Sequence, residues 1–237
     1  MIDFTEGYIL SIDKPYAWTS TDVVRKIKIL LRNKAGLKKI KVGHAGTLDP
    51  LATGLLIVCI GKATKNIENI QSGEKEYIAD ICFGATTPSF DLETEIDRQY
   101  PFEHINGDLI KSVFPLFLGK QEQIPPLFSA KLIDGKRAYE YARTGETPEM
   151  RPASIEIRNL ELLDYTAPIA KIKINCSKGT YVRSFARDLG VALQSGGYLC
   201  KLRRTVSGEY DVANALTIGE VEAILSLSQN PAVARQN

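Results

Sequence analysis

The chain has 237 residues, of which 44% are hydrophobic and 24% charged. This composition is typical of a globular protein with one large domain or two small ones, and the formal net charge of +2 does not by itself demand a nucleic-acid partner. No apolar stretch approaches the roughly 20 residues that span a bilayer. The first residues also lack the basic start of a signal peptide, so we expect a cytoplasmic protein with no membrane partner.

The first 60 residues predict a strand, a helix and a buried strand. GYILSID (7–13) favours a strand that ends at Lys14-Pro15, and TSTD (19–22) offers capping side chains for the helix that follows. Apolar residues recur there at helical spacing, with basic residues on the opposite face. The apolar run LLIVCIG (55–61) fits a strand buried on both faces.

A stiff loop is predicted between these elements, in the run HAGTLDPLATG (44–54). Pro50 restricts its own backbone and that of Asp49, and glycines allow bends where a side chain would clash. One carboxylate, Asp49, is therefore held on a rigid loop with His44 close by. An Asp before a Pro is more often a turn cap than a reactive group. We expect Lys14, Arg25 and Lys28 to share a surface with this loop.

The rest of the chain alternates strands and helices at irregular intervals. Period-two alternation places Lys75 and Tyr77 on the same face of a strand at 75–84. Further strands are expected at 154–165, 170–179 and 199–212, helices at 107–119 (broken near Pro115), 136–146, 180–197 and 218–229, a loop at 86–97, and a turn at Asp134-Gly135. This order predicts an α+β fold with a mixed, mostly antiparallel sheet flanked by helices, in one continuous unit.

Charge is distributed unevenly, and the cysteines are dispersed. Residues 25–41 hold eight basic residues and no acid: Arg25, Lys26, Lys28, Arg32, Lys34, Lys38, Lys39 and Lys41. Such a block fits RNA binding about as well as it fits a solvated helix face. The four cysteines form no CxxC pair, and with two histidines a zinc site is not expected. We expect buried free thiols in a reducing compartment.

Several familiar site motifs do not fit the chain. GKATK (61–65) lacks the spacing of a phosphate-binding loop, and no GxGxxG opens a βαβ unit. Three shorter pieces carry chemistry: KEY (75–77), SKGTYVRS (177–184) and LRRT (202–205). Taken singly, each is more often structural than functional.

Together and in order, six segments resemble the TruB family of tRNA pseudouridine synthases, which act on the T-arm uridine at tRNA position 55. They are DKPYAWTS, HAGTLDPLATGLLIVCIGKATK, KEYIADICFG, IPPLFSAKLIDGKRAYEYARTG, SKGTYVRSFARDLG and GGYLCKLRRTVSGEY. The resemblance implies a pseudouridine synthase fold with RNA-binding loops and a catalytic domain over 1–212. Residues 213–237 would form a short C-terminal helix and tail, too short for a PUA-type RNA-binding domain.

The resemblance also assigns roles. Asp49 falls on the catalytic aspartate, Tyr77 on the aromatic that stacks on the target base, and Arg183 on the Arg that pairs with the catalytic carboxylate. It further implies a reaction without cofactor or metal, with the tRNA T-arm stem-loop as partner and no obligate protein partner.

Three more residues fall on the substrate-binding positions of the family. Tyr181 and Leu202 match residues that line the uracil pocket, and His44 matches the His that contacts RNA near the extruded nucleotides. Whether Asp49 attacks C6 of the ring or C1′ of the sugar, or removes a proton from C2′, stays open. The alternatives to a synthase are an RNA-binding or RNA-folding factor whose activity has lapsed, and a hydrolytic glycosylase, which needs a second carboxylate.

Overall fold

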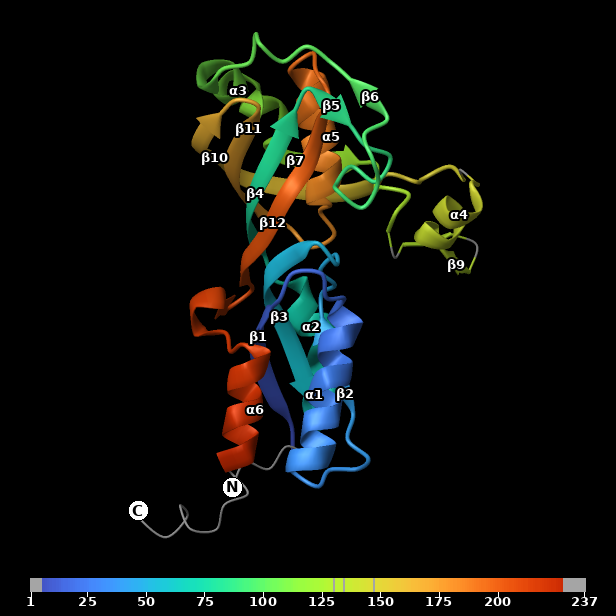
Figure 1. Ribbon diagram of the computed structural model, residues 1–237, viewed down its shortest axis with the longest axis vertical. Helices are drawn as coiled ribbons and strands as arrows, with labels where there is room; N and C mark the ends of the chain where they lie inside the picture. Colours follow the sequence, from blue (N-terminus) through green and yellow to red (C-terminus); the bar gives the residue numbers. More distant parts are fainter. Residues whose placement is uncertain (1–5, 130, 134, 147, 228–237) are drawn as a thin grey trace. The chain divides into compact units, whose positions relative to one another are not determined.

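The computed structural model describes residues 6–129, 131–133, 135–146 and 148–227 (Figure 1). These residues form two compact units, one built from the chain up to Lys75 together with the part from Arg203 onward, the other from Glu76–Leu202. The chain passes between the units within two strands, β4 (Lys75–Phe83) and β12 (Gly197–Ser207). The α+β class and the mostly antiparallel sheet expected from the sequence are confirmed. The division at residue 212 stays a prediction.

In the first unit, β3 (Ala52–Ile60) is the central strand. It pairs antiparallel with β1 (Tyr8–Lys14), from Tyr8 opposite Ile60 to Lys14 opposite Gly54, and with β2 (Val42–Ala45). Seven consecutive residues of β3, 54–60, are buried, as the apolar run LLIVCIG predicts. The far half of β12 and the short β13 (Tyr210–Asp211) complete this part of the sheet.

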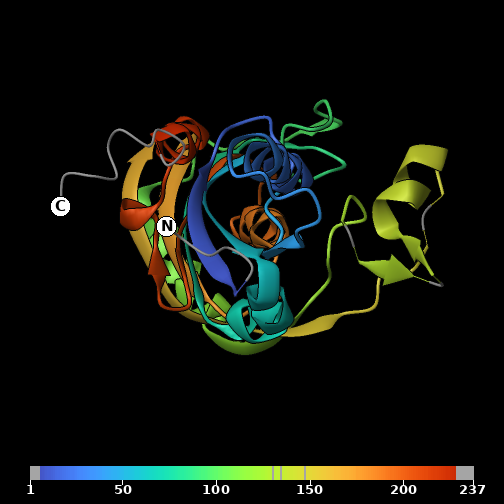
Figure 2. The ribbon, with the colours of Figure 1, turned by 90° about the horizontal axis from the view of Figure 1, so that it is seen from below.

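Helices of the first unit lie beside these strands. α1 (Ser20–Lys34) begins at Thr19, whose side chain and that of Asp22 form a reciprocal capping box, so the predicted start is correct. α1 and α6 (Ile218–Leu227) flank β1 in both ribbon views (Figures 1 and 2), and Lys26 pairs with Glu222 at 3.3 Å. The remaining elements are α2 (Ile67–Ser72) and 3₁₀ turns at Gly61–Asn66 and Val212–Asn214.

In the second unit, the sheet runs from the near half of β12 through β4, β11 (Ile169–Cys176) and β10 (Ala153–Thr166) to β7 (Gly119–Gln123). β4 alternates buried and half-buried residues without exception, as expected. α5 (Val182–Ala192) buries Val182, Phe185, Ala186 and Leu189, and Phe185 meets Phe117 edge to face at 5.3 Å.

Smaller elements complete the second unit. α3 (Gly107–Val113) gives way to a 3₁₀ turn at Phe114–Phe117, where Pro115 lacks the N–H that a helix needs. β5 (Ala85–Thr86) pairs with β6 (Arg98–Gln99), and β8 (Leu132–Ile133) with β9 (Lys136–Arg137). β8, β9 and α4 (Ala138–Thr144) project from the sheet of this unit (Figures 1 and 2). Asp134, placed at the predicted turn, lies outside the described residues, and within them no helix has the length and apolar character needed to cross a membrane.

Candidate active site

Asp49 lies on the loop that joins β2 to β3, and its main-chain oxygen accepts a hydrogen bond from Ala52 N at 3.1 Å. Gly46 begins this loop and Gly54 is the third residue of β3, and both have a φ of +96°, a backbone conformation that residues with a side chain rarely adopt. A Cβ on Gly54 would collide with the backbone of Arg204. The sequence therefore specifies a bend at each end of the segment that carries the carboxylate.

The middle of this loop is fixed by Ser20 at the start of α1. Ser20 Oγ accepts a hydrogen bond from Leu48 N at 2.9 Å and donates one to Leu48 O at 3.1 Å. Ser20 and Leu48 are both buried, at 2% and 3% exposure. Buried main-chain groups need partners, so one hydroxyl satisfies both polar groups of the residue that precedes Asp49.

Lys14 supports the other side of Asp49. Its ammonium donates to the main-chain oxygens of Pro15 at 3.0 Å, Trp18 at 2.5 Å and Pro50 at 3.2 Å. Lys14 contacts the loop through Pro50, as expected, but it does so from the interior, because its side chain is fully buried. Burial lowers the pKa of Lys14 to about 8, while the charge of Asp49 opposes that change.

Arg204, on β12, holds the two ends of the same loop. Its Nε donates to Leu55 O at 2.7 Å and its Nη2 to Gly46 O at 3.1 Å, and the side chain is 1% exposed. The planar guanidinium has several N–H donors that point in different directions, so one side chain can bind both main-chain oxygens. Ser20, Lys14 and Arg204 thus fix the loop backbone on both sides of Asp49 from three elements of the first unit.

His44 lies on β2, opposite Val58. Burial, and then the positive charge of Arg204, lower the pKa of His44 below its usual value, which keeps the imidazole neutral at pH 7. Its Nδ1 atom is buried and makes no hydrogen bond with the part of the chain that the structure describes. A neutral imidazole offers one donor and one acceptor to a ligand.

The second unit holds the other four predicted residues. Tyr77 on β4 and Leu202 on β12 are each 8% exposed, and Lys75 shares the buried face with Tyr77, as the alternation predicts. Tyr181 caps the start of α5. The side-chain amide of Gln123 binds both main-chain polar atoms of Tyr181: its oxygen accepts from Tyr181 N at 2.8 Å, and its nitrogen donates to Tyr181 O at 3.1 Å.

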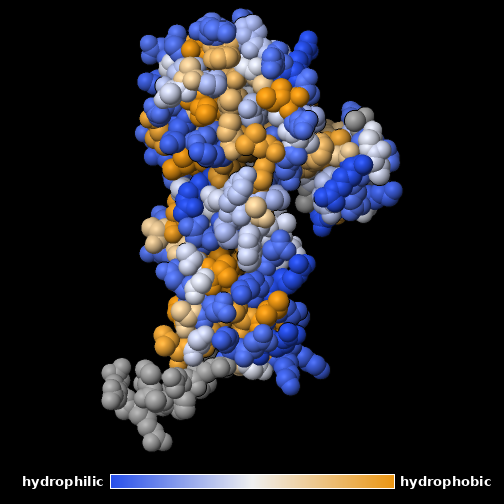
Figure 3. Space-filling model, in the orientation of Figure 1, coloured by the Kyte–Doolittle hydropathy of each residue, from blue (hydrophilic) through white to orange (hydrophobic). Residues whose placement is uncertain are grey.

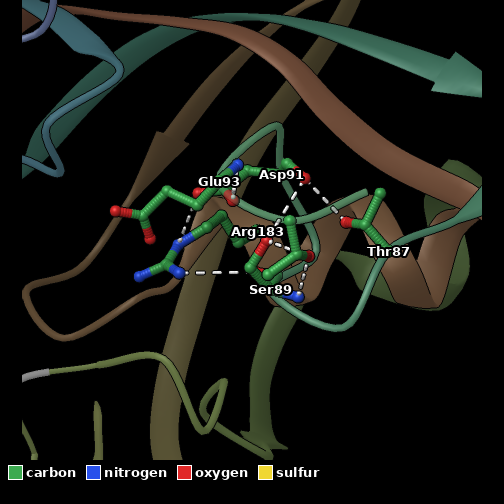
Figure 4. A network of polar contacts seen from close by, with 6 residues as sticks. Thr87, Ser89, Asp91, Glu93 and Arg183 are labelled. Atoms are coloured by element: carbon green, nitrogen blue, oxygen red, sulfur yellow. Dashed lines mark hydrogen bonds and ion pairs between the residues drawn. The ribbon is translucent and has the colours of Figure 1, made fainter. Parts of the chain in front are cut away.

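Arg183, in the first turn of α5, meets a folded loop centred on Asp91 (Figure 4). Arg183 Nε lies 3.7 Å from Asp91 Oδ2 and Nη1 donates to Ser89 O at 3.3 Å; the two charged side chains are 2% and 5% exposed. Asp91 Oδ1 accepts from Glu93 N at 2.9 Å, and Asp91 O accepts from the hydroxyls of Thr87 and Ser89. The loop predicted at 86–97 therefore places a carboxylate beside the predicted Arg.

The two units divide the predicted residues between them. Asp49 and His44 belong to the first unit, and Tyr77, Tyr181, Arg183 and Leu202 to the second. Buried polar contacts within the first unit hold the loop that carries Asp49, and others within the second unit hold Tyr181 and Arg183. Pairing of Arg183 with Asp49 stays a prediction. The described residues contain no group of three or more His, Cys, Asp or Glu side chains arranged to hold a metal ion.

Sequence reasoning missed four polar residues that support these side chains: Ser20, Gln123, Asp91 and Arg204. Their partners lie 28, 58, 92 and up to 158 positions away along the chain. Ser20 and Arg204 belong to short segments that the sequence had singled out, TSTD and LRRT. No local pattern distinguishes the supporting residue from its neighbours in either segment.

The basic block at 25–41 lies on α1 and the loop that follows it. Arg25 pairs with Asp22 at 3.1 Å and Lys26 with Glu222. The other six basic residues have no ion-pair partner among residues whose positions are described. Lys38, Lys39 and Lys41 are exposed. In Figure 3, which has the orientation of Figure 1, hydrophilic residues cover much of the surface over α1. Six cations are thus left for an external anion.

Known proteins resemble the chain over most of its length. Residues 32–182 match the family described as TruB family pseudouridylate synthase (N terminal domain). A protein of Phocaeicola vulgatus named tRNA pseudouridine synthase B is 54% identical over 217 residues, 92% of each chain. A Trichormus variabilis protein of the same name is 40% identical, with 93% of this chain and 73% of that protein aligned. A chain in the crystal structure of a Cbf5-Nop10-Gar1 complex superposes with a TM-score of 0.72 at 26% identity, covering 95% of this chain and 56% of that one.

Proposed function

The chain belongs to the TruB family of pseudouridylate synthases, and from that premise we propose that its target is the uridine at position 55 in the T arm of tRNA, with Asp49 as the nucleophile. The enzyme is an isomerase that converts uridine in tRNA to pseudouridine. The observation that carries the proposal is the fixed loop around Asp49. Ser20, Lys14 and Arg204 hold its backbone on both sides of the carboxylate.

The reaction detaches uracil from C1′ of the ribose, rotates it and rejoins it through C5. The hydrogen on C5 leaves as a proton and N1 of the released ring gains one, so atoms and electrons balance without an oxidant, a metal or a cofactor. A carboxylate suits this chemistry because it is ionised at neutral pH. Attack on C6, attack on C1′ and removal of a C2′ proton all assign the first step to Asp49.

The residues of the second unit would receive the base. A uridine in a folded RNA loop must leave its stack, at a cost of a few kcal/mol. Stacking on Tyr77 would offset about 1–3 kcal/mol of that cost. Tyr181, held by Gln123, and Leu202 would line the uracil pocket. Arg183, oriented by Asp91, would pair with the Asp49 carboxylate and keep it ionised in a dry pocket.

The RNA around the target would contact the first unit. We assign the RNA contact near the extruded nucleotides to the neutral imidazole of His44. The unpaired cations of the 25–41 block would bind phosphates, which gives affinity without sequence readout. The substrate is tRNA, and the proposal includes a cytoplasmic location and no obligate protein partner.

The deciding experiment incubates a T-arm stem-loop RNA with the wild-type chain, with Asp49→Asn, and with Asp108→Asn as a matched control at an exposed position of α3. The proposal expects pseudouridine at the position of uridine 55 with the wild type and the control only. Free uracil would indicate a glycosylase. Tight binding without product from the wild type would indicate an RNA-folding factor. Pseudouridine formed by Asp49→Asn at the wild-type rate would exclude Asp49 as the nucleophile.

A further inference from the structure

A groove of about 340 Å³ lies along one face of α1, in the first unit. We call it the α1 groove, and it is lined by Ala17, Trp18, Asp22, Arg25, Lys26 and Ile29. Within α1, positions 22, 25, 26 and 29 recur at helical spacing and so form one stripe. The buried residues of α1 form a different stripe, which faces the core. The α1 groove is therefore a surface feature that core packing does not explain.

The turn at one end of the groove carries two aromatic residues. Tyr16 is 58% exposed and Trp18 is half-buried. Ala17, between them, has a φ of +62°, which residues with a side chain rarely adopt. Such backbone persists only where its surroundings hold it, and it clusters at ligand sites. Here the buried ammonium of Lys14 holds the turn, because it binds the main-chain oxygens of Pro15 and Trp18 on either side.

The same turn is attached to the loop that carries Asp49. The Lys14 ammonium that binds Trp18 O also binds Pro50 O, directly after Asp49. On the other side of Asp49, Leu48 is bonded to Ser20, the first residue of α1. An RNA whose target base lies at Asp49 therefore brings its neighbouring nucleotides to the aromatic end of the α1 groove.

A row of cations runs beside the groove. Arg25, Lys28 and Arg32 are exposed and follow one another at helical spacing on α1. Arg25 pairs with Asp22, but the two side chains are 68% and 40% exposed, so this pair is weak and can give way to a phosphate. An aromatic side chain beside a row of cations is typical of sites for single-stranded nucleic acid, in which a base stacks and the backbone follows the positive charges.

We propose that the α1 groove binds one unpaired nucleotide of the substrate RNA, with its base stacked on the indole of Trp18 and its phosphates at Arg25 and Lys28. This proposal rests on the proposed function, because it places the nucleotide in the T loop beside the target uridine. It concerns a different base from the one assigned to Tyr77. Because duplex RNA offers no free base to stack, the groove favours the loop over the stem.

The test uses the fluorescence of Trp18, which is the only tryptophan in the chain. A T-arm stem-loop RNA is titrated into the full chain, with a fully paired RNA duplex of the same length as the control. The stem-loop should quench the emission with the midpoint that filter retention gives for binding, and the duplex should not. Replacing one loop base other than the target by an abasic site should abolish the quenching. Stem-loop binding without quenching, or equal quenching by the duplex, overturns the proposal.

Variants separate a binding role of the indole from support of the loop. Trp18→Ala should weaken stem-loop binding by about 10-fold, and Trp18→Phe should restore most of the affinity. The single-turnover rate at saturating RNA should stay at the wild-type value, because the main-chain oxygen that binds Lys14 remains. A fall in that rate with unchanged affinity would make Trp18 a support of the loop and overturn the proposal.

A matched pair at exposed positions avoids any loss of folding. Ile29→Ala, in the groove, should weaken stem-loop binding by about threefold, and Leu163→Ala, on β10, should leave it unchanged; the two wild-type side chains are 40% and 41% exposed. Equal effects of the two variants would contradict the groove. Urea unfolding of each variant shows that it is folded.

Pseudouridine formation in the same samples distinguishes this proposal from the proposed function. Product without quenching overturns the groove and keeps the function, whereas quenching without product keeps the nucleotide site and overturns the function. Emission that changes with protein concentration alone would place a second copy in the groove and overturn the proposal. The samples contain a reductant, because the expectation of four buried thiols is correct for Cys59 and Cys176 only, and Cys82 and Cys200 are half-buried.

Discussion

Replacing Ser20 with Ala tests whether the fixed loop positions the carboxylate. The change removes one hydroxyl that satisfies both Leu48 N, at 2.9 Å, and Leu48 O, at 3.1 Å. A buried polar group left without a partner costs about 1–3 kcal/mol. The summed cost of two such groups would exceed that range, but a small shift of the loop that lets water bind these groups recovers part of the lost free energy. We expect the free energy of unfolding to fall by about 2 kcal/mol.

The effect on catalysis should be larger than the effect on binding. A displacement of about 1 Å at the reacting group costs on the order of 100-fold in rate. We expect kcat to fall by about 10- to 100-fold, with the KM for RNA changed less than about threefold. The assay follows tritium released from C5 of the target uridine in a T-arm RNA. It is run under single-turnover conditions for the rate and at varied RNA for KM.

The neighbouring residue supplies the control. Thr19→Ala removes the capping box of α1, which costs about 1 kcal/mol, but leaves both bonds to Leu48 in place. It should lower stability and keep kcat. The reasoning is refuted if folded Ser20→Ala keeps the wild-type kcat, or if Thr19→Ala lowers kcat to the same degree.

Three further predictions concern charge. Burial lowers the pKa of Lys14 from 10.5 to about 8, so between these pH values the unfolded chain binds a proton that the folded chain has lost. The free energy of unfolding should therefore rise with pH across this window, by about 3 kcal/mol relative to Lys14→Met. Urea unfolding at several pH values measures this difference. Asp91→Asn leaves the buried Arg183 without its carboxylate and should destabilise by about 3 kcal/mol in the same assay. Lys38→Ala, Lys39→Ala and Lys41→Ala combined should weaken tRNA binding and reduce the slope of log affinity against log salt by about 2.

Each of these three predictions has a control variant or a result that would contradict it. A stability difference between wild type and Lys14→Met that is flat from pH 8 to 10.5 contradicts the first. Asp97→Asn, at an exposed carboxylate bonded to Thr86, should change stability by less than about 0.5 kcal/mol. Lys111→Ala, at an exposed position of α3, should keep the salt dependence of tRNA binding. Unchanged affinity and slope in the triple variant would exclude this basic segment from RNA binding.

The sequence predicts local structure well where one signal dominates. The cap at Thr19, the apolar run of β3, the strict alternation of β4 and the break at Pro115 are each read from a few adjacent residues, and each is confirmed. These features depend on backbone preferences and on burial of one face, which the sequence order carries directly.

The supports of the site were not predictable in that way. Lys14 looked like a surface cation, yet three main-chain oxygens bind its ammonium in the interior. Arg204 and Asp91 looked like an ordinary strand residue and a loop residue, because their partners lie far away in the chain. The division into two units leaves no compositional trace, since the chain crosses inside two regular strands. The catalytic and binding roles of the six predicted residues stay predictions.

The crossing of the chain through β4 and β12 also sets the order in which the parts can be completed during synthesis. The second unit is a contiguous stretch, Glu76–Leu202, inserted into the first. All of its residues leave the ribosome before Arg204 does. The loop that carries Asp49 is made early, but the side chain that ties Gly46 to Leu55 arrives about 150 residues later. The nascent chain therefore carries the Asp49 carboxylate long before the contacts that fix its loop are complete.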